Sequence, residues 1–173
     1  SRHTSFRIGG AADYYYEPET AEELKSLLAR CKAEGIPSAV IGNGSNLLVG
    51  DKGFRGAVIR LGEGFGAIEV NENRLRAEAG ALLAKLARTA ANAGLSGLAF
   101  AAGIPGTVGG ALVMNAGAYG GEMKDILESA ELLLPDGSVR CFTGEELELG
   151  YRHSNIPALG AIVLSATFVL TPG

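Results

Sequence analysis

A glycine-rich stretch spans residues 103–111 and reads Gly103-Ile104-Pro105-Gly106-Thr107-Val108-Gly109-Gly110-Ala111. It is followed closely by Asn115-Ala116-Gly117-Ala118-Tyr119-Gly120-Gly121. Six of the 18 residues from 103 to 120 are glycine, and their neighbours are small or β-branched, unlike the Ser-rich composition of flexible linkers. Because glycine lacks a Cβ atom, it lets main-chain N–H groups lie directly against a ligand. The stretch therefore predicts a backbone that passes very close to something large and flat.

A second cluster with the same character lies about sixty residues earlier, as Gly42-Asn43-Gly44-Ser45-Asn46-Leu47. A Rossmann fingerprint would need a third glycine where Leu47 stands, and a helix directly behind it. No Gly-Lys-Ser/Thr phosphate loop occurs anywhere in the chain. Ser45 and Asn46 add side-chain donors to exposed amides, which suits a phosphate or pyrophosphate. Together the two loops predict a cradle for a dinucleotide.

Thr107 is expected to open a short helix that runs through Met114. Two interpretations of its start remain open at this point. Its free N–H groups could form another anion site. Alternatively, the helix is buried and packs closely through Gly109, Gly110 and Ala111.

Composition excludes several classes of protein. The net charge of −4 argues against a nucleic-acid partner, and no run of 18 apolar residues offers a membrane span. Cys31 and Cys141 share no metal or redox spacing, so both are expected to be small buried thiols in a reducing compartment. No metal site is expected. The chain starts without Met and stops just after an apolar strand, so we expect a partial chain or an excised domain.

The pattern of the remaining chain predicts an α+β fold rather than a regular βαβ array. Thr20 with Glu23 forms a capping box for a helix with an apolar stripe from Leu24 to Cys31, and Gly35 ends that helix. A second helix is expected over 82–93. Strands are expected over 14–16, 38–41, 57–60, 68–71, 75–79, 126–134, 138–142 and 161–169, with hairpins at 72–73 and 135–137. The hairpin near Leu75 suggests two lobes, approximately 1–72 and 73–173.

Tyr151-Arg152-His153-Ser154 is the third candidate motif. An arginine beside an aromatic residue and just before an apolar strand can hold a carboxylate in a fork. A solvated surface arginine explains the same spacing equally well. Neither His153 nor His3 belongs to a Ser-His-Asp set.

Five ordered motifs closely resemble one family. They are Thr4-Ser5-Phe6-Arg7-Ile8-Gly9-Gly10, Ile41 to Asn46, Gly103 to Gly110, Asn115 to Gly120, and Tyr151 to Ser154. Over practically the whole chain the sequence resembles the UDP-N-acetylenolpyruvoylglucosamine reductases (UDP-N-acetylmuramate dehydrogenases), the flavoenzymes of bacterial peptidoglycan synthesis.

The resemblance implies an FAD-binding domain of the PCMH or vanillyl-alcohol-oxidase type, in two α+β lobes with FAD between them. It implies an active-site role for Arg152 and substrate contacts for Tyr119, Tyr151 and Arg152. Neither glycine-rich loop contains histidine, so FAD is expected to bind non-covalently. The implied cofactor-binding residues are Gly42, Asn43, Gly44, Ser45, Asn46, Leu47, Gly103, Ile104, Pro105, Gly106, Thr107, Gly109, Gly110, Ala111, Asn115, Gly117 and Ala118.

The resemblance also implies NADPH as hydride donor, a UDP-sugar substrate and a monomer in the bacterial cytoplasm. One departure is large. The family's proton-donating serine, in a Gly-Ser-Phe-Phe-Lys-Asn-like segment, and its later glutamate belong to a C-terminal substrate domain. Neither motif occurs in these 173 residues, so we expect that domain to be absent from this chain. The chain alone is therefore expected to bind FAD but to be inactive. Two alternatives are a sugar or lactone oxidase of the same fold and a non-catalytic nucleotide-binding domain.

Overall fold

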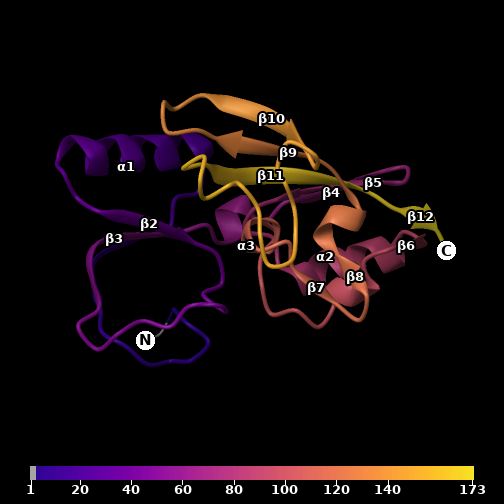
Figure 1. Cartoon of the computed structure of the whole chain (residues 1–173), viewed down its shortest axis with the longest axis horizontal. Helices are drawn as coiled ribbons and strands as arrows, with labels where there is room; N and C mark the ends of the chain where they lie inside the picture. Colours follow the sequence, from indigo (N-terminus) through magenta and orange to yellow (C-terminus); the bar gives the residue numbers. More distant parts are fainter. Residues whose placement is uncertain (1–2) are drawn as a thin grey trace.

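Two main sheets, two small two-stranded sheets and three α-helices make up the described part of the fold in Figure 1, a computed structural model that describes residues 3–173. The helices are α1 (Ala21–Ala33), α2 (Leu83–Asn92) and α3 (Val108–Val113). The longer strands are β1 (Ala12–Tyr16), β2 (Ser38–Ile41), β3 (Phe54–Arg60), β4 (Ile68–Asn71), β5 (Arg74–Glu78), β9 (Leu127–Leu133), β10 (Val139–Thr143) and β11 (Ile162–Val169). The two-residue strands are β6 (Leu95–Ser96), β7 (Gly117–Ala118), β8 (Gly121–Glu122) and β12 (Thr171–Pro172). Short 3-10 turns are η1 (Glu63–Phe65), η2 (Ala99–Ala101) and η3 (Met123–Asp125).

The first helix begins where the capping pattern predicts. Thr20 Oγ1 accepts a hydrogen bond from the Glu23 N–H at 3.2 Å, which satisfies one of the free donors at the start of α1. Leu24 and Cys31 are buried on the inner stripe, and Gly35 follows the helix at φ +65°. The Thr20 cap, the apolar stripe and the end of this helix are confirmed, but the capping box is not reciprocal, because Glu23 Oε2 accepts from the Glu19 N–H at 2.8 Å.

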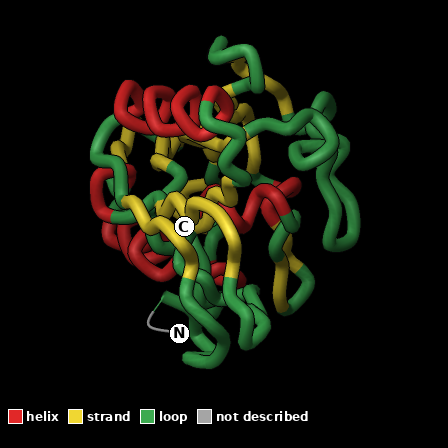
Figure 2. Tube along the Cα trace, turned by 90° about the vertical axis from the view of Figure 1, so that its left-hand side faces the viewer, coloured by secondary structure: helices red, strands yellow, loops and turns green. Residues whose placement is uncertain are grey.

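The first sheet is entirely parallel, with β3 between β1 and β2. The crossover from β1 to β2 is α1, which lies along this sheet in Figure 1. After β2 the chain passes into a long loop rather than a helix, and it returns as β3. This connection excludes a Rossmann unit, as the missing third glycine indicated. Figure 2 draws these loop segments in green, below α1 and toward the N-terminal end.

The second sheet is antiparallel in the order β10-β9-β11-β5-β4. Both predicted hairpins, β4–β5 and β9–β10, are present in it. One face carries the fully buried Leu75, Leu132 and Phe168 and packs on α2 and α3, which lie below the sheet in Figure 1. The sheet and these helices form a continuous hydrophobic core.

The expected lobe boundary at 72/73 falls at the turn of a hairpin inside one sheet, and it stays a prediction. Residues 72 and 73 form the turn of the β4–β5 hairpin, and both strands belong to the five-stranded sheet. The chain changes sheets earlier, over residues 61–67, between β3 and β4. The sequence favoured the hairpin because its turn residues are conspicuous, whereas the true crossing contains the buried Leu61 and Phe65 and resembles core. The division into two lobes itself stays a prediction.

Cys141 is a second correction, since it is exposed while Cys31 is buried. It lies on the edge strand β10 beside the buried Phe142, whose side chain points to the opposite face. Strand alternation therefore places this thiol on the outer, polar face of the five-stranded sheet.

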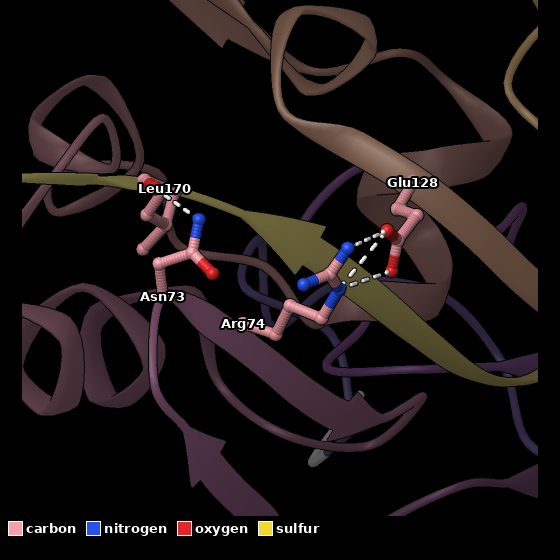
Figure 3. A network of polar contacts seen from close by, with 4 residues as sticks. All are labelled: Asn73, Arg74, Glu128 and Leu170. Carbon is pink, nitrogen blue, oxygen red and sulfur yellow. Dashed lines mark hydrogen bonds and ion pairs between the residues drawn. The ribbon is translucent and has the colours of Figure 1, made fainter.

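Ion pairs on that outer face connect strands that are not direct neighbours. Arg74 on β5 pairs with Glu128 on β9, across the intervening strand β11, and its Nη2 lies 2.8 Å from Glu128 Oε1 (Figure 3). Nearby, the Asn73 side chain donates a hydrogen bond to the Leu170 carbonyl. Arg76 lies 2.7 Å from Glu131, whose carboxylate also accepts from the Ser165 hydroxyl at 2.5 Å. These contacts span β5, β11 and β9.

The Ser165 hydroxyl and then the Arg76 guanidinium hold the pKa of Glu131 below its ordinary 4.5. A depressed carboxyl pKa stabilises the fold above the ordinary pKa, and this contribution disappears as pH falls through the folded pKa. We therefore expect Glu131→Gln to lower the free energy of unfolding by about 1 kcal/mol at pH 7, after solvent screening. The difference should shrink in denaturant titrations as the pH falls below 4.5 and through the lowered pKa of the folded protein. A loss that stays constant as the pH is lowered through this range, or an equal effect of the exposed Glu145→Gln, would contradict the assignment.

Candidate cofactor and substrate site

A cavity of about 560 Å³ lies where the two glycine-rich loops meet. Its volume is in the range that holds a drug-sized ligand or cofactor. All but two of the predicted cofactor-binding residues line it. They are Gly42, Asn43, Gly44, Ser45, Asn46, Leu47, Gly103, Ile104, Pro105, Gly106, Thr107, Gly109, Gly110, Ala111 and Gly117. The structure thus brings together loops that are about sixty residues apart in the sequence.

The first loop leaves β2 with its amides unused. No backbone N–H of residues 42–46 donates a hydrogen bond to any described residue. The loop is instead held through a carbonyl, because Ser5 N–H donates to Gly44 O at 3.2 Å. Gly44 adopts φ +64°, a conformation that only glycine reaches without strain. The loop is therefore fixed in a shape that leaves successive donors free.

Direct packing joins the two loops. A Cβ at Gly42 would collide with the Thr107 hydroxyl, and Thr107 is itself buried. A Cβ at Gly106 would lie 3.8 Å from Ser45 Oγ. The close approach of Gly42 to Thr107 explains why this position is glycine, and it sets the width of the cavity at that end.

The start of α3 is only partly free, which agrees with the interpretation of a helix packed closely through Gly109 and limits the anion-site interpretation. The Val108 and Gly109 amides donate to the carbonyls of Ala81 and Ala79, each at 2.9 Å. A Cβ at Gly109 would lie 3.0 Å from Ala79 Cβ, so this glycine allows close packing. Gly110 differs, because the nearest atom to its Cβ position is Thr107 Oγ1 at 3.8 Å and the residue is exposed to the cavity.

The cavity has little charge. Among the described residues that line it, Arg152 is the one that carries a charge. Arg55, in the same part of the sequence as the first loop, pairs instead with Asp13 at 2.7 Å. A phosphate here would therefore be held mainly by neutral main-chain donors, as the sequence predicts.

Sequence reasoning missed the apolar walls of this cavity. The additional lining residues are Val40, Ile41, Leu61, Ala79, Leu83, Val113, Met114, Ala116, Ala161, Ile162 and Val163. They come from strand ends and helix faces, where an apolar residue is indistinguishable from core in a single sequence. These residues come together only because β11 packs beside α3 in the folded chain, a contact that the sequence alone does not indicate.

A second hollow of about 300 Å³ adjoins the first. It is lined by Met114, Asn115, Ala116, Gly117, Ala118, Tyr119, Gly120, Gly121, Glu122, Tyr151 and Arg152. It contains the two predicted cofactor-binding residues missing from the first cavity, together with all three predicted substrate contacts. Gly117 and Arg152 line both hollows, so Arg152 stands where they join.

Three of the six non-glycine residues with positive φ within residues 3–173 line this second hollow. Asn115, Tyr119 and Arg152 have φ of +41°, +52° and +48°, in a region that non-glycine residues rarely adopt. Such strain typically costs about 1–3 kcal/mol per residue and clusters at binding and catalytic sites. The strained positions coincide with residues that the motifs single out for function.

Tyr119 and Tyr151 extend fully into solvent, with exposed fractions of 101% and 91%. Large aromatic rings are usually at least partly covered, because their burial contributes strongly to stability. Two uncovered tyrosines at the rim of a hollow therefore mark a surface suited to a ligand or partner.

The Asn115 side chain forms hydrogen bonds within the protein, whereas the resemblance implies a contact with the cofactor. Its Nδ2 donates to Glu122 Oε2 at 2.6 Å and to Gly150 O at 2.9 Å, and its Oδ1 accepts from the Lys124 N–H. The Glu122 carboxylate also raises the pKa of Lys124 above its ordinary 10.5. The buried Asn115 side chain thus uses both amide N–H groups and one lone pair of Oδ1 in hydrogen bonds within the protein.

Thr4 is a polar residue beside the first loop that sequence reasoning left without a role. Its Oγ1 is buried and has no hydrogen-bond partner within residues 3–173. Its Cα lies 3.2 Å from the Cβ position at Gly44. Because an unpaired buried hydroxyl is costly, this atom favours a ligand that reaches the first loop.

Within residues 3–173, no three His, Cys, Asp or Glu side chains are placed to share a metal ion. None of the described helices is both long and apolar enough to cross a membrane.

Fold and site together define a class of protein, in which α+β sheets support a neutral main-chain cradle at a cavity of cofactor size. The family model for the FAD binding domain matches residues 12–142. The chain belongs to this family of FAD-binding domains, and its fold is the PCMH type that the motifs imply.

Individual relatives carry a more specific name. The chain is 55% identical to the UDP-N-acetylenolpyruvoylglucosamine reductase of Agathobacter rectalis, over 99% of this chain and 58% of that protein. It is 49% identical to the protein of the same name from Clostridioides difficile, over 99% and 57%. The solved UDP-N-acetylenolpyruvylglucosamine reductase from Thermus caldophilus matches with a TM-score of 0.85 and 43% identity, over 99% of this chain and 60% of that one. The chain thus spans less than two thirds of these relatives.

Proposed function

We propose that this chain is the FAD-binding part of an NADPH-dependent reductase that converts UDP-N-acetylglucosamine enolpyruvate to UDP-N-acetylmuramate in bacterial peptidoglycan synthesis. The observation that carries the proposal is the meeting of two amide-bearing glycine loops beside Arg152. The names of the relatives support the same reaction. We place this enzyme in the cytoplasm, as a monomer.

The residues present fit FAD. The free amides of residues 42–46 suit the diphosphate, since main-chain N–H groups bind phosphate well without a positive side chain. The unpaired Thr4 hydroxyl and the open Gly110 position add to this fit. Apolar residues from β11 and α3 supply the walls that an aromatic ring system needs. FAD, once bound here without a covalent link, supplies the chemistry of hydride transfer.

Arg152 has the charge that the proposed reaction requires. Reduction of an enolpyruvyl double bond builds negative charge toward the substrate carboxylate. A fixed guanidinium stabilises that charge more in the transition state than in the ground state. Within the described residues Arg152 has no hydrogen-bond or ion-pair partner, so its charge stays available to a substrate. Tyr119 and Tyr151 are proposed to contact the UDP-sugar beside it.

The proton transfer that completes the reduction is assigned elsewhere. No Gly-Ser-Phe-Phe-Lys-Asn-like segment occurs in these 173 residues. We therefore assign the proton donor to the further length that the relatives possess, and we expect this chain alone to bind FAD without complete turnover. The high identity to proteins named as reductases favours this function over a sugar oxidase or a non-catalytic domain.

Flavin binding and reduction test the proposal directly. The purified chain should be yellow and should release FAD on heating or acid treatment. In the complete reductase, NADPH should bleach the flavin absorbance and the enolpyruvyl UDP-sugar should restore it. A colourless protein that gains no FAD on titration, or a reduced flavin that the UDP-sugar leaves unchanged, would contradict the proposal.

A further inference from the structure

Arg152 lies at the tip of a very tight turn. Gly150 N–H donates to His153 O at 3.0 Å, and His153 N–H donates back to Gly150 O at 3.1 Å. Only Tyr151 and Arg152 lie between them, and Arg152 has the positive φ that the third residue of some tight turns requires. Glycine or asparagine usually occupies such a position, so an arginine there is strained.

The position of the Arg152 guanidinium therefore depends on the turn that carries it. Within residues 3–173, no carboxylate or carbonyl holds this guanidinium. A long side chain on a strained turn keeps one orientation only if its backbone is anchored by other contacts. What anchors residues 150–154 thus controls where the charge is placed.

Two side-chain contacts anchor the turn, and both lead to the end of α3. Asn115 Nδ2 donates to Gly150 O at 2.9 Å on one side of the turn. Ser154 Oγ donates to Val113 O at 2.8 Å on the other. Asn115 and Ser154 are both buried, with exposed fractions of 3% and 5%. The turn is therefore tied on either side of Arg152 to the helix that begins at the cofactor cavity.

The Asn115 amide is itself held in one orientation. Glu122 Oε2 accepts from its Nδ2 at 2.6 Å, and the Lys124 N–H donates to its Oδ1 at 2.9 Å. Glu122 requires a donor and the Lys124 N–H requires an acceptor, so the side-chain nitrogen and oxygen of Asn115 cannot be exchanged. The nitrogen therefore faces the Gly150 carbonyl, to which it donates.

We propose that Asn115 and Ser154 are positioning residues, which fix the Arg152 turn against the end of α3 and so aim its charge into the site. The inference rests on the proposed function of Arg152. It gives Asn115 a role through Arg152 rather than through direct contact with the cofactor. It also explains why Ser154 accompanies the Tyr-Arg pair in the third motif.

Hydrogen exchange tests the anchoring without any assay of activity. In the FAD-loaded protein, Asn115→Gly keeps a backbone that tolerates positive φ but removes the amide, and Ser154→Ala removes only the hydroxyl. Each should speed exchange of the Gly150 and His153 amides by about tenfold. Asn73→Gly is the matched control, because it also removes an amide that donates to a carbonyl, that of Leu170 (Figure 3). Unchanged exchange of both amides in both anchor variants would overturn the inference.

Stopped-flow kinetics of the complete reductase test the consequence. Both anchor variants should slow flavin oxidation by the enolpyruvyl UDP-sugar about tenfold more than flavin reduction by NADPH. Combined with Arg152→Ala, either variant should cause no further loss, since it acts through Arg152. Additive losses would overturn the inference.

The two proposals fail in different ways. If Arg152→Ala alone leaves flavin oxidation unchanged, the proposed function of Arg152 is wrong. If Arg152→Ala slows that step but neither anchor variant does, only the positioning inference is wrong. Should Asn115→Gly fail to fold, Ser154→Ala carries the same test, because it removes a single hydrogen bond.

Discussion

Gly110→Val is expected to weaken FAD binding at least about a hundredfold while the protein still folds. The Cβ position at Gly110 meets only Thr107 Oγ1, at 3.8 Å, and the residue is open to the cavity. A valine side chain would therefore fill space intended for the cofactor without displacing protein atoms. Glycine is also a poor helix former, so its loss from α3 does not lower the propensity for helix. FAD titration of the apoprotein and its thermal unfolding curve measure the two effects separately.

Gly50→Val is the matched control for this experiment. No atom lies within 4 Å of the Cβ position at Gly50, and the residue does not line the cavity. It should therefore retain FAD with unchanged affinity. If Gly110→Val bound FAD as tightly as Gly50→Val, the cofactor could not lie against α3.

Arg152→Ala is expected to slow flavin oxidation by the enolpyruvyl UDP-sugar by about 10²–10³-fold, the usual effect of losing one charge-stabilising group. Flavin reduction by NADPH should be largely retained, because that step builds no charge on the substrate carboxylate. Stopped-flow absorbance of the complete reductase separates the two steps. Alanine also removes the guanidinium without filling either hollow, so FAD content should be preserved.

Arg152→Lys separates charge from geometry at the same position. Lysine keeps the positive charge but lacks the planar fork, so it should recover only part of the lost rate. An equal loss in both steps, or full activity of the alanine variant, would contradict the role assigned to Arg152.

Local sequence signals were sufficient where the structure depends on neighbouring residues. The cap at Thr20, the apolar stripe of α1 and the two hairpins follow from short-range chemistry, and each is confirmed. The glycine clusters also predicted that residues 42–47 and 103–111 meet, because such density is unusual outside a close backbone approach.

Contacts between residues that are far apart in the sequence could not be predicted in the same way. One of the two interpretations of the start of α3 left its first amides free, but the carbonyls of Ala81 and Ala79 accept from the Val108 and Gly109 amides. No local pattern predicts which distant strand end supplies an acceptor. The exposure of Cys141 depends on its edge strand, and the point where the chain passes from one sheet to the other depends on the path from β3 to β4; both are properties of sheet order.

Asn115 shows the same limit within the site. The sequence marks it through its glycine neighbours, but its three hydrogen bonds involve Glu122, Lys124 and Gly150. The contact with Gly150 crosses 35 positions of sequence. The motif therefore marked a region that lines the second hollow, while the hydrogen bonds of Asn115 could be seen only in the folded structure.

Binding of FAD and of riboflavin to the apoprotein tests most directly whether neutral amides hold the diphosphate. Riboflavin keeps the isoalloxazine ring but has no phosphate. We expect FAD to bind at least about a hundredfold more tightly, and we expect its affinity to change by less than about threefold between 0.1 and 0.5 M salt, because neutral donors are weakly screened. Equal affinity for the two flavins, or a steep loss of FAD binding with salt, would contradict the account.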